Sequence, residues 1–186
     1  MSADQQQTLS HPVPRPAPNA APRAQAEREP QQDAGPGAPD VAVPQPAAEY
    51  LHVRLLEQAR RVAGTLARQG VRPAERVAVL LPMSPESVAV TMACGRLDAV
   101  RVSLPVGAGS PLLRERIRSS GAGVLVVADS CVHAGRIYPA KQLVERVLDG
   151  CPAVRSVIVV HQVARPVPWT PGRDLWWHEA LARLEV

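Results

Sequence analysis

Short runs of branched apolar residues alternate with helix-like segments along most of this chain, and this alternation restricts its fold more than any other feature. The clearest example reads R-V-A-V-L-L-P-M-S-P-E, residues 76–86. Residues 77–81 form a continuous apolar run, as in strands buried on both faces, and a proline ends it. Ser84 is a suitable helix N-cap, and Pro85 suits the first helical position. The stretch predicts a buried strand over 77–81 and a helix from Pro85 to about Asp98.

The same order of strand and helix repeats toward the end of the chain. Ser110 and Pro111 repeat the pairing of Ser84 and Pro85, so Ser110 is predicted to be an N-cap, while Gly121 is a suitable stop. Strands that alternate with helices of about ten residues predict a parallel sheet with helices on both faces, which binds ligands beyond the carboxyl ends of its strands. The other predicted elements are helix 51–69, strand 99–106, helix 110–119, strand 123–128, helix 139–148 and strand 154–160.

The first 47 residues differ in composition from the rest. Ten of the twenty prolines lie before residue 47, among Ala, Gln and scattered charges. Such a segment cannot bury enough apolar surface to offset the entropy lost on ordering. We therefore expect a disordered Pro/Ala/Gln-rich tail over residues 1–47 and one α/β domain over residues 48–186.

The two parts also differ in charge. Residues 1–49 carry three Arg against six Asp and Glu, a net of −3, whereas residues 50–186 carry eighteen basic against eleven acidic residues, a net of +7. A basic domain attracts anionic ligands over long distances, although an Arg-rich solvated surface is the simpler explanation. No basic run is interleaved with aromatic residues, so we predict no binding to nucleic acid.

Cysteine spacing and the chain's start exclude other classes. Cys94, Cys131 and Cys151 are far apart and odd in number, which indicates neither a disulfide framework nor a metal site. The sequence lacks a signal-peptide pattern and any run of eighteen apolar residues, so a cytoplasmic protein without a membrane anchor is expected. Cys94 and His161 are predicted to be structural, as packing and strand-end residues. We expect Trp169, Trp176 and Trp177 to seal the edge of the sheet.

One glycine pattern offers an alternative function. After the predicted second strand the chain reads V-G-A-G-S-P-L, and Asp129 lies twenty residues beyond Gly109, the offset of an acid that binds a dinucleotide's ribose. The third glycine of that motif is replaced by Leu112, and Pro111 removes an N–H that could have met phosphate. A glycine-rich turn is the simpler interpretation, but a small dinucleotide-binding domain that uses Gly107, Gly109 and Asp129 remains an alternative.

Five blocks of sequence carry a family resemblance. In order they read G-V-x-x-x-E-R-V-A-V-L-L-P-M-S-P-E, A-C-G-R-L-D-A-V, R-I-R-S-S-G-A-G-V-L-V-V-A-D, G-C-P-A-V-R-S-V-I-V-V and V-P-W-T-P-G-R-D-L-W-W-H-E. Together they resemble the front of AMP-forming acetyl-CoA synthetases and their short-chain acyl relatives, which are adenylate-forming ligases. The resemblance implies a partial N-terminal α/β subdomain of the large domain of those enzymes.

The resemblance also implies a chemistry that this sequence covers only in part. Family members use ATP and Mg²⁺ to convert a carboxylate into an acyl-adenylate and then pass the acyl group to CoA. They need a Gly/Ser/Thr-rich phosphate loop, an acyl pocket and a lysine on a C-terminal domain. None of these occurs in the 186 residues, whose only lysine is Lys141. We therefore expect no catalytic residues, no activity of this chain alone and no tightly bound cofactor or metal.

The resemblance implies one wall of a CoA site. A family pattern like A-D-G-G-x-R-x-G-R, whose two arginines reach the nucleotide phosphate, appears as A-D-S-C-V-H-A-G-R, residues 128–136. Arg136 matches the second arginine and is carried over as a CoA-phosphate contact. The first is replaced by His133, which is a weaker phosphate clamp because imidazole is largely neutral at pH 7. An aromatic-glycine turn near the adenine appears as P-V-G-A, residues 105–108, and keeps only Gly107.

The sequence thus predicts the front portion of an acetate or short-chain acyl-CoA ligase, inactive alone. As an alternative, the chain is an interaction module that docks on a synthetase, completes a split one, or forms a homo-oligomer through an exposed sheet or helix surface. Apolar surface that lacks its covering partner marks such an interface.

Overall fold

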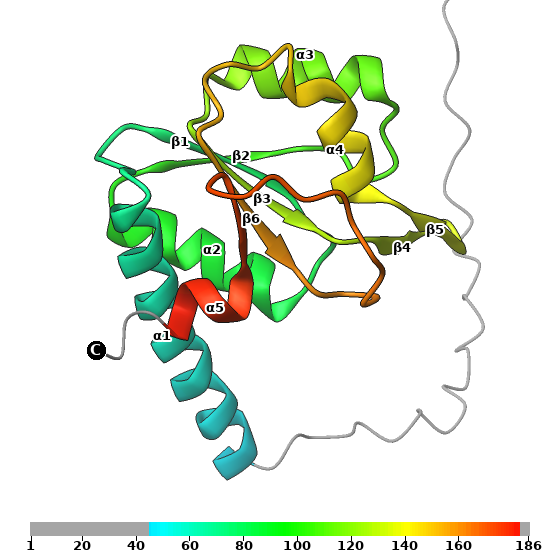
Figure 1. The fold of residues 1–186 in the computed structure, drawn as a ribbon. Helices are drawn as coiled ribbons and strands as arrows, with labels where there is room; N and C mark the ends of the chain where they lie inside the picture. The colour runs from blue at the N-terminus through cyan, green and yellow to red at the C-terminus, as the bar shows by residue number, and fades with distance from the viewer. Residues whose placement is uncertain (1–44, 183–186) are drawn as a thin grey trace, which may run out of the picture. The chain divides into compact units, whose positions relative to one another are not determined.

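The computed structural model describes residues 45–182, with side chains from Tyr50 onward (Figure 1). The strands of this part are β1 Arg76–Leu80, β2 Val100–Ser103, β3 Val124–Ala128, β4 Cys131–His133, β5 Arg136–Tyr138, β6 Ser156–Val160 and β7 Asp174–Trp176. The helices are α1 Gln45–Arg68, α2 Pro85–Arg96, α3 Ser110–Ser120, α4 Ala140–Leu148 and α5 Trp177–Ala182. The disorder expected for residues 1–47 concerns mainly residues that lie outside the described part.

Five strands form one parallel sheet in the order β2-β1-β3-β6-β7, as the alternating pattern predicts. The chain passes from β1 outward to β2 and then returns across β1 to β3, so the strand order reverses between β1 and β3. Parallel α/β sheets bind ligands beyond the carboxyl ends of the strands at such a reversal. In this chain the loops after β1 and β3 flank the reversal, and β2 is the neighbour of β1 on its outer side.

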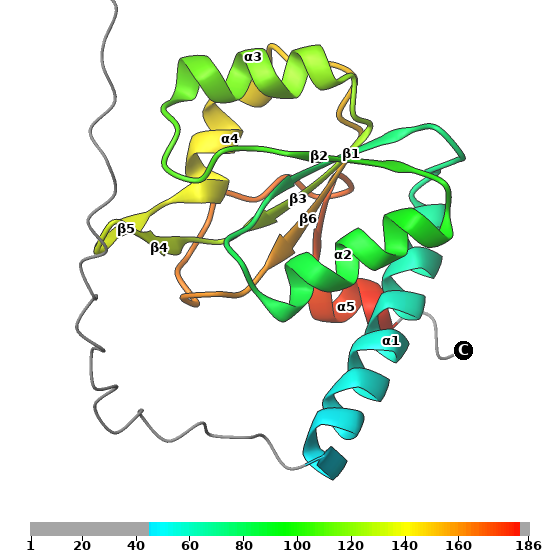
Figure 2. The same cartoon turned by 180° about the vertical axis from the view of Figure 1, so that it is seen from behind.

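Helices cover both faces of the sheet, which confirms the predicted fold class. Figures 1 and 2 show α3 and α4 on one face and α1, α2 and α5 on the other. All residues of β3 and β6 are buried, and β1 is buried from Val77 to Leu80. Strands enclosed in this way bury branched apolar side chains on both faces, which is why these segments read as unbroken apolar runs.

The start of α2 follows the sequence prediction, whereas the start of α3 does not. Ser84 is the N-cap of α2, and its Oγ accepts a hydrogen bond from the Ser87 N–H at 3.2 Å. The prediction that Ser110 caps α3 is wrong, because the N-cap is Gly109 and Ser110 is the first helical residue. Pro111 therefore occupies the second helical position, and proline in a first helical turn does not by itself fix where the helix begins.

Other boundaries differ by a few residues. The strand predicted over 99–106 is shorter, since β2 ends at Ser103 and Pro105 has no N–H to extend the ladder. The helix predicted from residue 51 begins already at Gln45. Gly70 and Gly121 follow α1 and α3 with φ of 81° and 61°, as expected of helix stops. Strands β4, β5 and β7 and helix α5 were not predicted.

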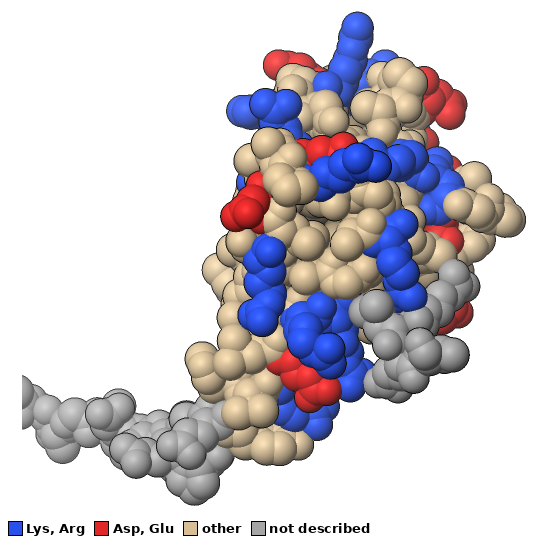
Figure 3. Space-filling view, turned by 90° about the vertical axis from the view of Figure 1, so that its left-hand side faces the viewer, with Lys and Arg blue, Asp and Glu red and all other residues tan. Residues whose placement is uncertain are grey.

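Two further features complete the fold. Trp176 is the last residue of the edge strand β7, and Trp169 stacks on it with ring centroids 4.7 Å apart, in agreement with the prediction that tryptophans seal this edge. Figure 3 shows Lys and Arg side chains spread over the side opposite the β4–β5 hairpin, with fewer acidic ones among them. Among the described residues, no helix is long and apolar enough to cross a membrane.

Candidate functional site

A small hairpin follows the carboxyl end of β3 and carries two of the residues singled out from the sequence. Strands β4 and β5 are antiparallel, and His133 pairs directly with Arg136 across them. The two residues between them, Ala134 and Gly135, have φ of 49° and 73°. Positive φ at both loop positions is the type I′ geometry that suits two-residue hairpins. The tight turn therefore fixes the imidazole and the guanidinium as neighbours.

The hairpin packs on the turn that follows β2. The Tyr138 hydroxyl donates a hydrogen bond of 2.7 Å to the carbonyl oxygen of Ala108. The His133 ring lies so close to Gly107 that a β-carbon at residue 107 would overlap its Nε2 and Cδ2 atoms. Gly107 also has φ of 91°, a conformation that other residues rarely adopt. The structure thus brings together Gly107 and the His133–Arg136 rung, which lie far apart in the sequence.

Arg136 is exposed at the first position of β5. Within residues 45–182 its guanidinium makes no ion pair or hydrogen bond, so its charge is available to an anion. Tyr138, in contrast, is buried, and burial raises the pKa of its phenol to about 12. The tyrosine is therefore a neutral hydrogen-bond donor at pH 7, and Arg136 is the cation of this hairpin.

Asp129 is buried at the base of the hairpin and is fully engaged. Its Oδ1 accepts hydrogen bonds from the backbone N–H groups of Ser130, Gln162 and Val163 at 2.6, 2.9 and 3.2 Å, and its Oδ2 accepts one from that of Arg165 at 2.9 Å. Burial alone would raise the pKa of this carboxyl, but the four donors lower it overall. A carboxylate used in this way holds the loop after β6 and does not face a ribose, so it gives the dinucleotide alternative no support.

A cluster of four charged side chains, two buried and two partly buried, anchors the loop before β7. Lys141 is fully buried, and its Nζ lies 2.5 Å from Glu145 Oε2 and 3.0 Å from Asp174 Oδ2. Arg173 reaches the same two acids, each at 2.7 Å. Burial alone would raise the pKa of both carboxyls, but these cations lower the pKa of Glu145 and Asp174 overall. The two positive charges neutralise the two negative ones, so we interpret the cluster as structural.

Aromatic rings stack where β6 and β7 end. His161 follows β6, as predicted for a strand-end residue, and its ring stacks on Trp176 at 4.0 Å between centroids. The centroid of the His178 ring lies 5.7 Å from that of the His161 ring. Cys94 is buried, and burial raises the pKa of its thiol to about 11, in keeping with the predicted packing role. Among the described residues, no group of three or more His, Cys, Asp or Glu side chains could hold a metal ion.

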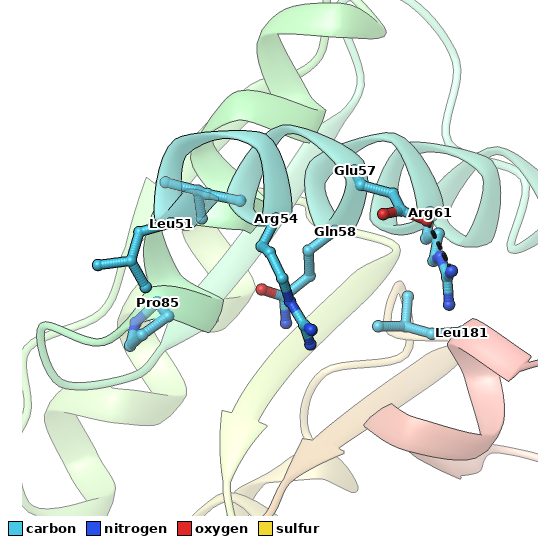
Figure 4. Close-up of a pocket in the computed structure, with 8 residues that line it drawn as sticks. Leu51, Arg54, Glu57, Gln58, Arg61, Pro85 and Leu181 are labelled. Atoms are coloured by element: carbon cyan, nitrogen blue, oxygen red, sulfur yellow. Dashed lines mark hydrogen bonds and ion pairs between the residues drawn. The ribbon is translucent and has the colours of Figure 1, made fainter. Parts of the chain in front are cut away.

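A groove with a volume of about 440 Å³ lies on the face that carries α1, α2 and α5. Figure 4 shows Leu51, Pro85 and Leu181 around it and Arg54 and Gln58 pointing into it. The sequence reasoning found no sign of this groove, because its residues come from three helices. It is separate from the hairpin and contains none of the residues predicted to bind CoA.

Comparison with known proteins identifies the family. A family model described as AMP-binding enzyme matches residues 26–182. The chain belongs to the family of AMP-binding enzymes. It is 40% identical over 129 residues to acetyl-coenzyme A synthetase of Halorhodospira halophila, a match that covers 69% of this chain and 20% of that protein. It is 37% identical over 129 residues to acetyl-coenzyme A synthetase of Emericella nidulans, with 69% of this chain and 19% of that protein covered.

A solved structure supports the fold of this family member. Acetoacetyl-CoA synthetase from Streptomyces lividans matches with a TM-score of 0.60 and 24% identity, over 70% of this chain and 20% of that one. The resemblance of the sequence to AMP-forming acetyl-CoA synthetases is therefore confirmed, as is the prediction that it concerns only part of such a protein. The chain spans about a fifth of the length of these relatives.

Proposed function

We propose that this chain supplies one wall of the CoA site of an AMP-forming acetate or short-chain acyl-CoA ligase. The observation that carries the proposal is the packing of the β4–β5 hairpin on Gly107. This contact sets Arg136, which has no ion pair among the described residues, on a hairpin beside the exposed turn at Gly107, beyond the carboxyl ends of β2 and β3. A ligand in that place meets a guanidinium that can bind a phosphate and the exposed backbone of Gly107.

Each residue has a separate part in the proposed site. Arg136 provides a charge-assisted hydrogen bond to a phosphate of CoA. Gly107 makes room for the His133 ring, and its exposed backbone is the part of the turn that the ligand would meet. His133 replaces a second cation and so weakens the phosphate clamp, while Tyr138 holds the hairpin on the turn through Ala108. ATP and Mg²⁺ would take part in the family reaction, which activates the carboxylate before transfer to CoA.

The expected affinity for CoA is low. One charge-assisted contact contributes about 1.5–3 kcal/mol. Immobilising a flexible nucleotide costs an estimated 4–15 kcal/mol, so one contact cannot hold CoA tightly. We therefore expect a dissociation constant no lower than about 1 mM, which corresponds to about 4 kcal/mol. The chain alone should form neither acyl-adenylate nor acyl-CoA.

An NMR titration with CoA tests the proposed site. Backbone amide shifts should concentrate at Gly107 and Arg136, vanish in Arg136→Ala, and persist in Arg116→Ala, which removes an exposed arginine from α3 as a control. His133→Arg should lower the dissociation constant a few-fold. Equal shifts in all variants, or micromolar affinity for NAD without CoA binding, would contradict the proposal.

Enzyme assays test the expected lack of activity. The purified chain, given acetate, ATP, Mg²⁺ and CoA, should release no pyrophosphate above a control without protein. Acetate-dependent release would mean that these residues contain a complete active site.

A further inference from the structure

Half of helix α1 lies outside the layer that supports the rest of it. Figures 1 and 2 show the helix running well past the sheet and past α2 toward its amino end. From Tyr50 to Gln58 no side chain is buried, and the first buried residue is Ala59. Isolated helices of about a dozen residues are marginal in water, so helices depend on a packed face. Between Tyr50 and Gln58 only Leu55, which is partly buried, packs against the core.

The stretch from Tyr50 to Val53 carries exposed apolar side chains. Tyr50, Leu51 and Val53 are 60%, 62% and 60% exposed. Met83, two residues before Pro85 at the start of α2, is 90% exposed. Exposed large apolar side chains that gather in one region mark an interaction surface, whereas single ones need no explanation.

One of these residues, Leu51, lines the groove of Figure 4. We call it the α1 groove and define it by its lining: Leu51, Arg54, Leu55, Glu57, Gln58, Arg61, Pro85 and Leu181. Apolar groups line both ends of the α1 groove, and the Arg54 and Gln58 side chains project between them. A helix with apolar residues at intervals of three or four positions can lie along such a groove. Its apolar face then buries the apolar groups at both ends of the groove.

The charges of the α1 groove indicate what the bound helix must carry. Its one acid, Glu57, is hydrogen-bonded to Arg61 at 2.7 Å. Arg54 has a neutral partner, the Tyr50 hydroxyl at 2.9 Å, and no hydrogen bond to an acid within the described residues. A complementary helix therefore places an Asp or Glu next to Arg54. A second copy of the same surface is less suited, because its only acid is already paired.

We propose that the α1 groove docks an acidic amphipathic helix of the polypeptide that makes up the rest of a synthetase. This proposal rests on the proposed function. It is supported by the family match, which includes all of α1, and by the size of the relatives, since this chain spans only about a fifth of them. The exposed apolar side chains at Tyr50, Leu51 and Val53 fit a contact with the remaining part.

A fluorescent label at Leu51 tests the contact at the predicted place. The three native cysteines are buried, so Leu51→Cys adds the one readily labelled thiol of the described residues. The full chain is labelled with bimane at this thiol. It is then mixed with the part of Halorhodospira halophila acetyl-CoA synthetase that follows the stretch matched by this chain. If this partner is insoluble on its own, it is produced by co-expression with untagged wild-type chain. Emission should shift to shorter wavelength on binding. Leu112→Cys on α3, on the other face of the sheet, should show no shift.

Charge and shape variants complete the test. Leu51→Asp and Arg54→Glu should each weaken co-purification with that partner at least about tenfold, as expected for central interface residues. Leu112→Asp is the matched control and should change it less than about twofold, as expected for a surface position away from the interface. All variants should keep the wild-type urea midpoint, because the substituted residues are exposed.

Each other outcome overturns the proposal. In the binding experiments, these outcomes are a lack of co-purification and a partner that stays insoluble when it is produced with the chain. In the variant and label experiments, they are equal effects of Leu51→Asp and Leu112→Asp, and a bimane shift produced by the chain alone. The last would identify a second copy as the occupant. The CoA titration involves Arg136 and not the α1 groove, so it can fail while docking is observed, and docking can fail while CoA binds.

Discussion

Replacing Lys141 tests whether the buried charge cluster is what holds the loop before β7. The Lys141 ammonium is fully buried between Glu145 and Asp174 and also donates a hydrogen bond of 3.0 Å to the Pro168 carbonyl oxygen. Removing one partner of a buried ion pair costs about 3–5 kcal/mol, because it leaves an uncompensated charge. We therefore expect Lys141→Met to lower the free energy of unfolding by an amount in this range.

The structure favours the lower end of that range. Arg173 keeps contact with both acids, at 2.7 Å from Glu145 Oε2 and 2.7 Å from Asp174 Oδ1, so neither carboxylate loses all its cationic partners. The cluster nevertheless changes from neutral to a net charge of −1, and the Pro168 carbonyl loses a donor. An unsatisfied buried polar group costs about 1–3 kcal/mol by itself. The expected loss is therefore about 3 kcal/mol.

Urea denaturation at pH 7 measures this loss. Arg146→Met on the same helix is the control, because Arg146 is exposed and surface substitutions usually change stability by no more than about 0.5 kcal/mol. Adding Glu145→Gln to Lys141→Met restores neutrality, so the double variant should be less destabilised than the sum of the two single changes. Equal losses for Lys141→Met and Arg146→Met, or additivity in the double variant, would refute the reasoning.

Three further outcomes are expected. The pKa of Asp129 is lowered in the folded chain, so its stabilising effect is present above the ordinary carboxyl pKa and lost as pH falls through the folded value; the urea midpoint should drop below about pH 4, less steeply in Asp129→Asn. Gly107→Ala should destabilise more than Gly172→Ala in thermal melts, since both have positive φ but only Gly107 meets the His133 ring. Ala134→Asn should raise the free energy of unfolding by about 1 kcal/mol and so raise the melting temperature, because asparagine tolerates the φ of 49° at residue 134 better than alanine does. An unchanged melting temperature would contradict this.

The parallel sheet was predictable because each of its inner strands is buried on both faces and reads as an apolar run. The hairpin was not predictable, since β4 and β5 have three residues each and two of the three side chains in each strand are exposed, so neither strand forms a buried apolar run. Its stability comes from Tyr138 bonding to Ala108 and from the His133 ring on Gly107, which are contacts across about thirty positions. Only the family resemblance pointed to Arg136 and Gly107 together, and local pattern gave no reason to pair them.

The charge cluster around Lys141 was also predictable only in part. Lys141 and Glu145 are four apart on one helix, a visible ion-pair spacing. Their partners Arg173 and Asp174 come from a loop that reaches the helix only in the folded chain. The position of Asp129 relative to Gly109 suggested a ribose contact, but the carboxylate meets four backbone N–H groups instead. Spacing identifies the residue that matters, and the fold decides what it binds.

The charged groups of this chain differ in whether they have partners within the fold or remain available to a ligand or another protein. The buried acids of the described residues are all engaged: Asp129 by backbone N–H groups, Asp174 by Lys141 and Arg173. These two carboxylates therefore stabilise the fold. Two arginines that have no hydrogen bond to an acid among the described residues carry the two proposals, Arg136 on the hairpin and Arg54 in the α1 groove. The first faces a proposed nucleotide and the second a proposed protein partner, and each can be reversed in charge without disturbing the core that positions it.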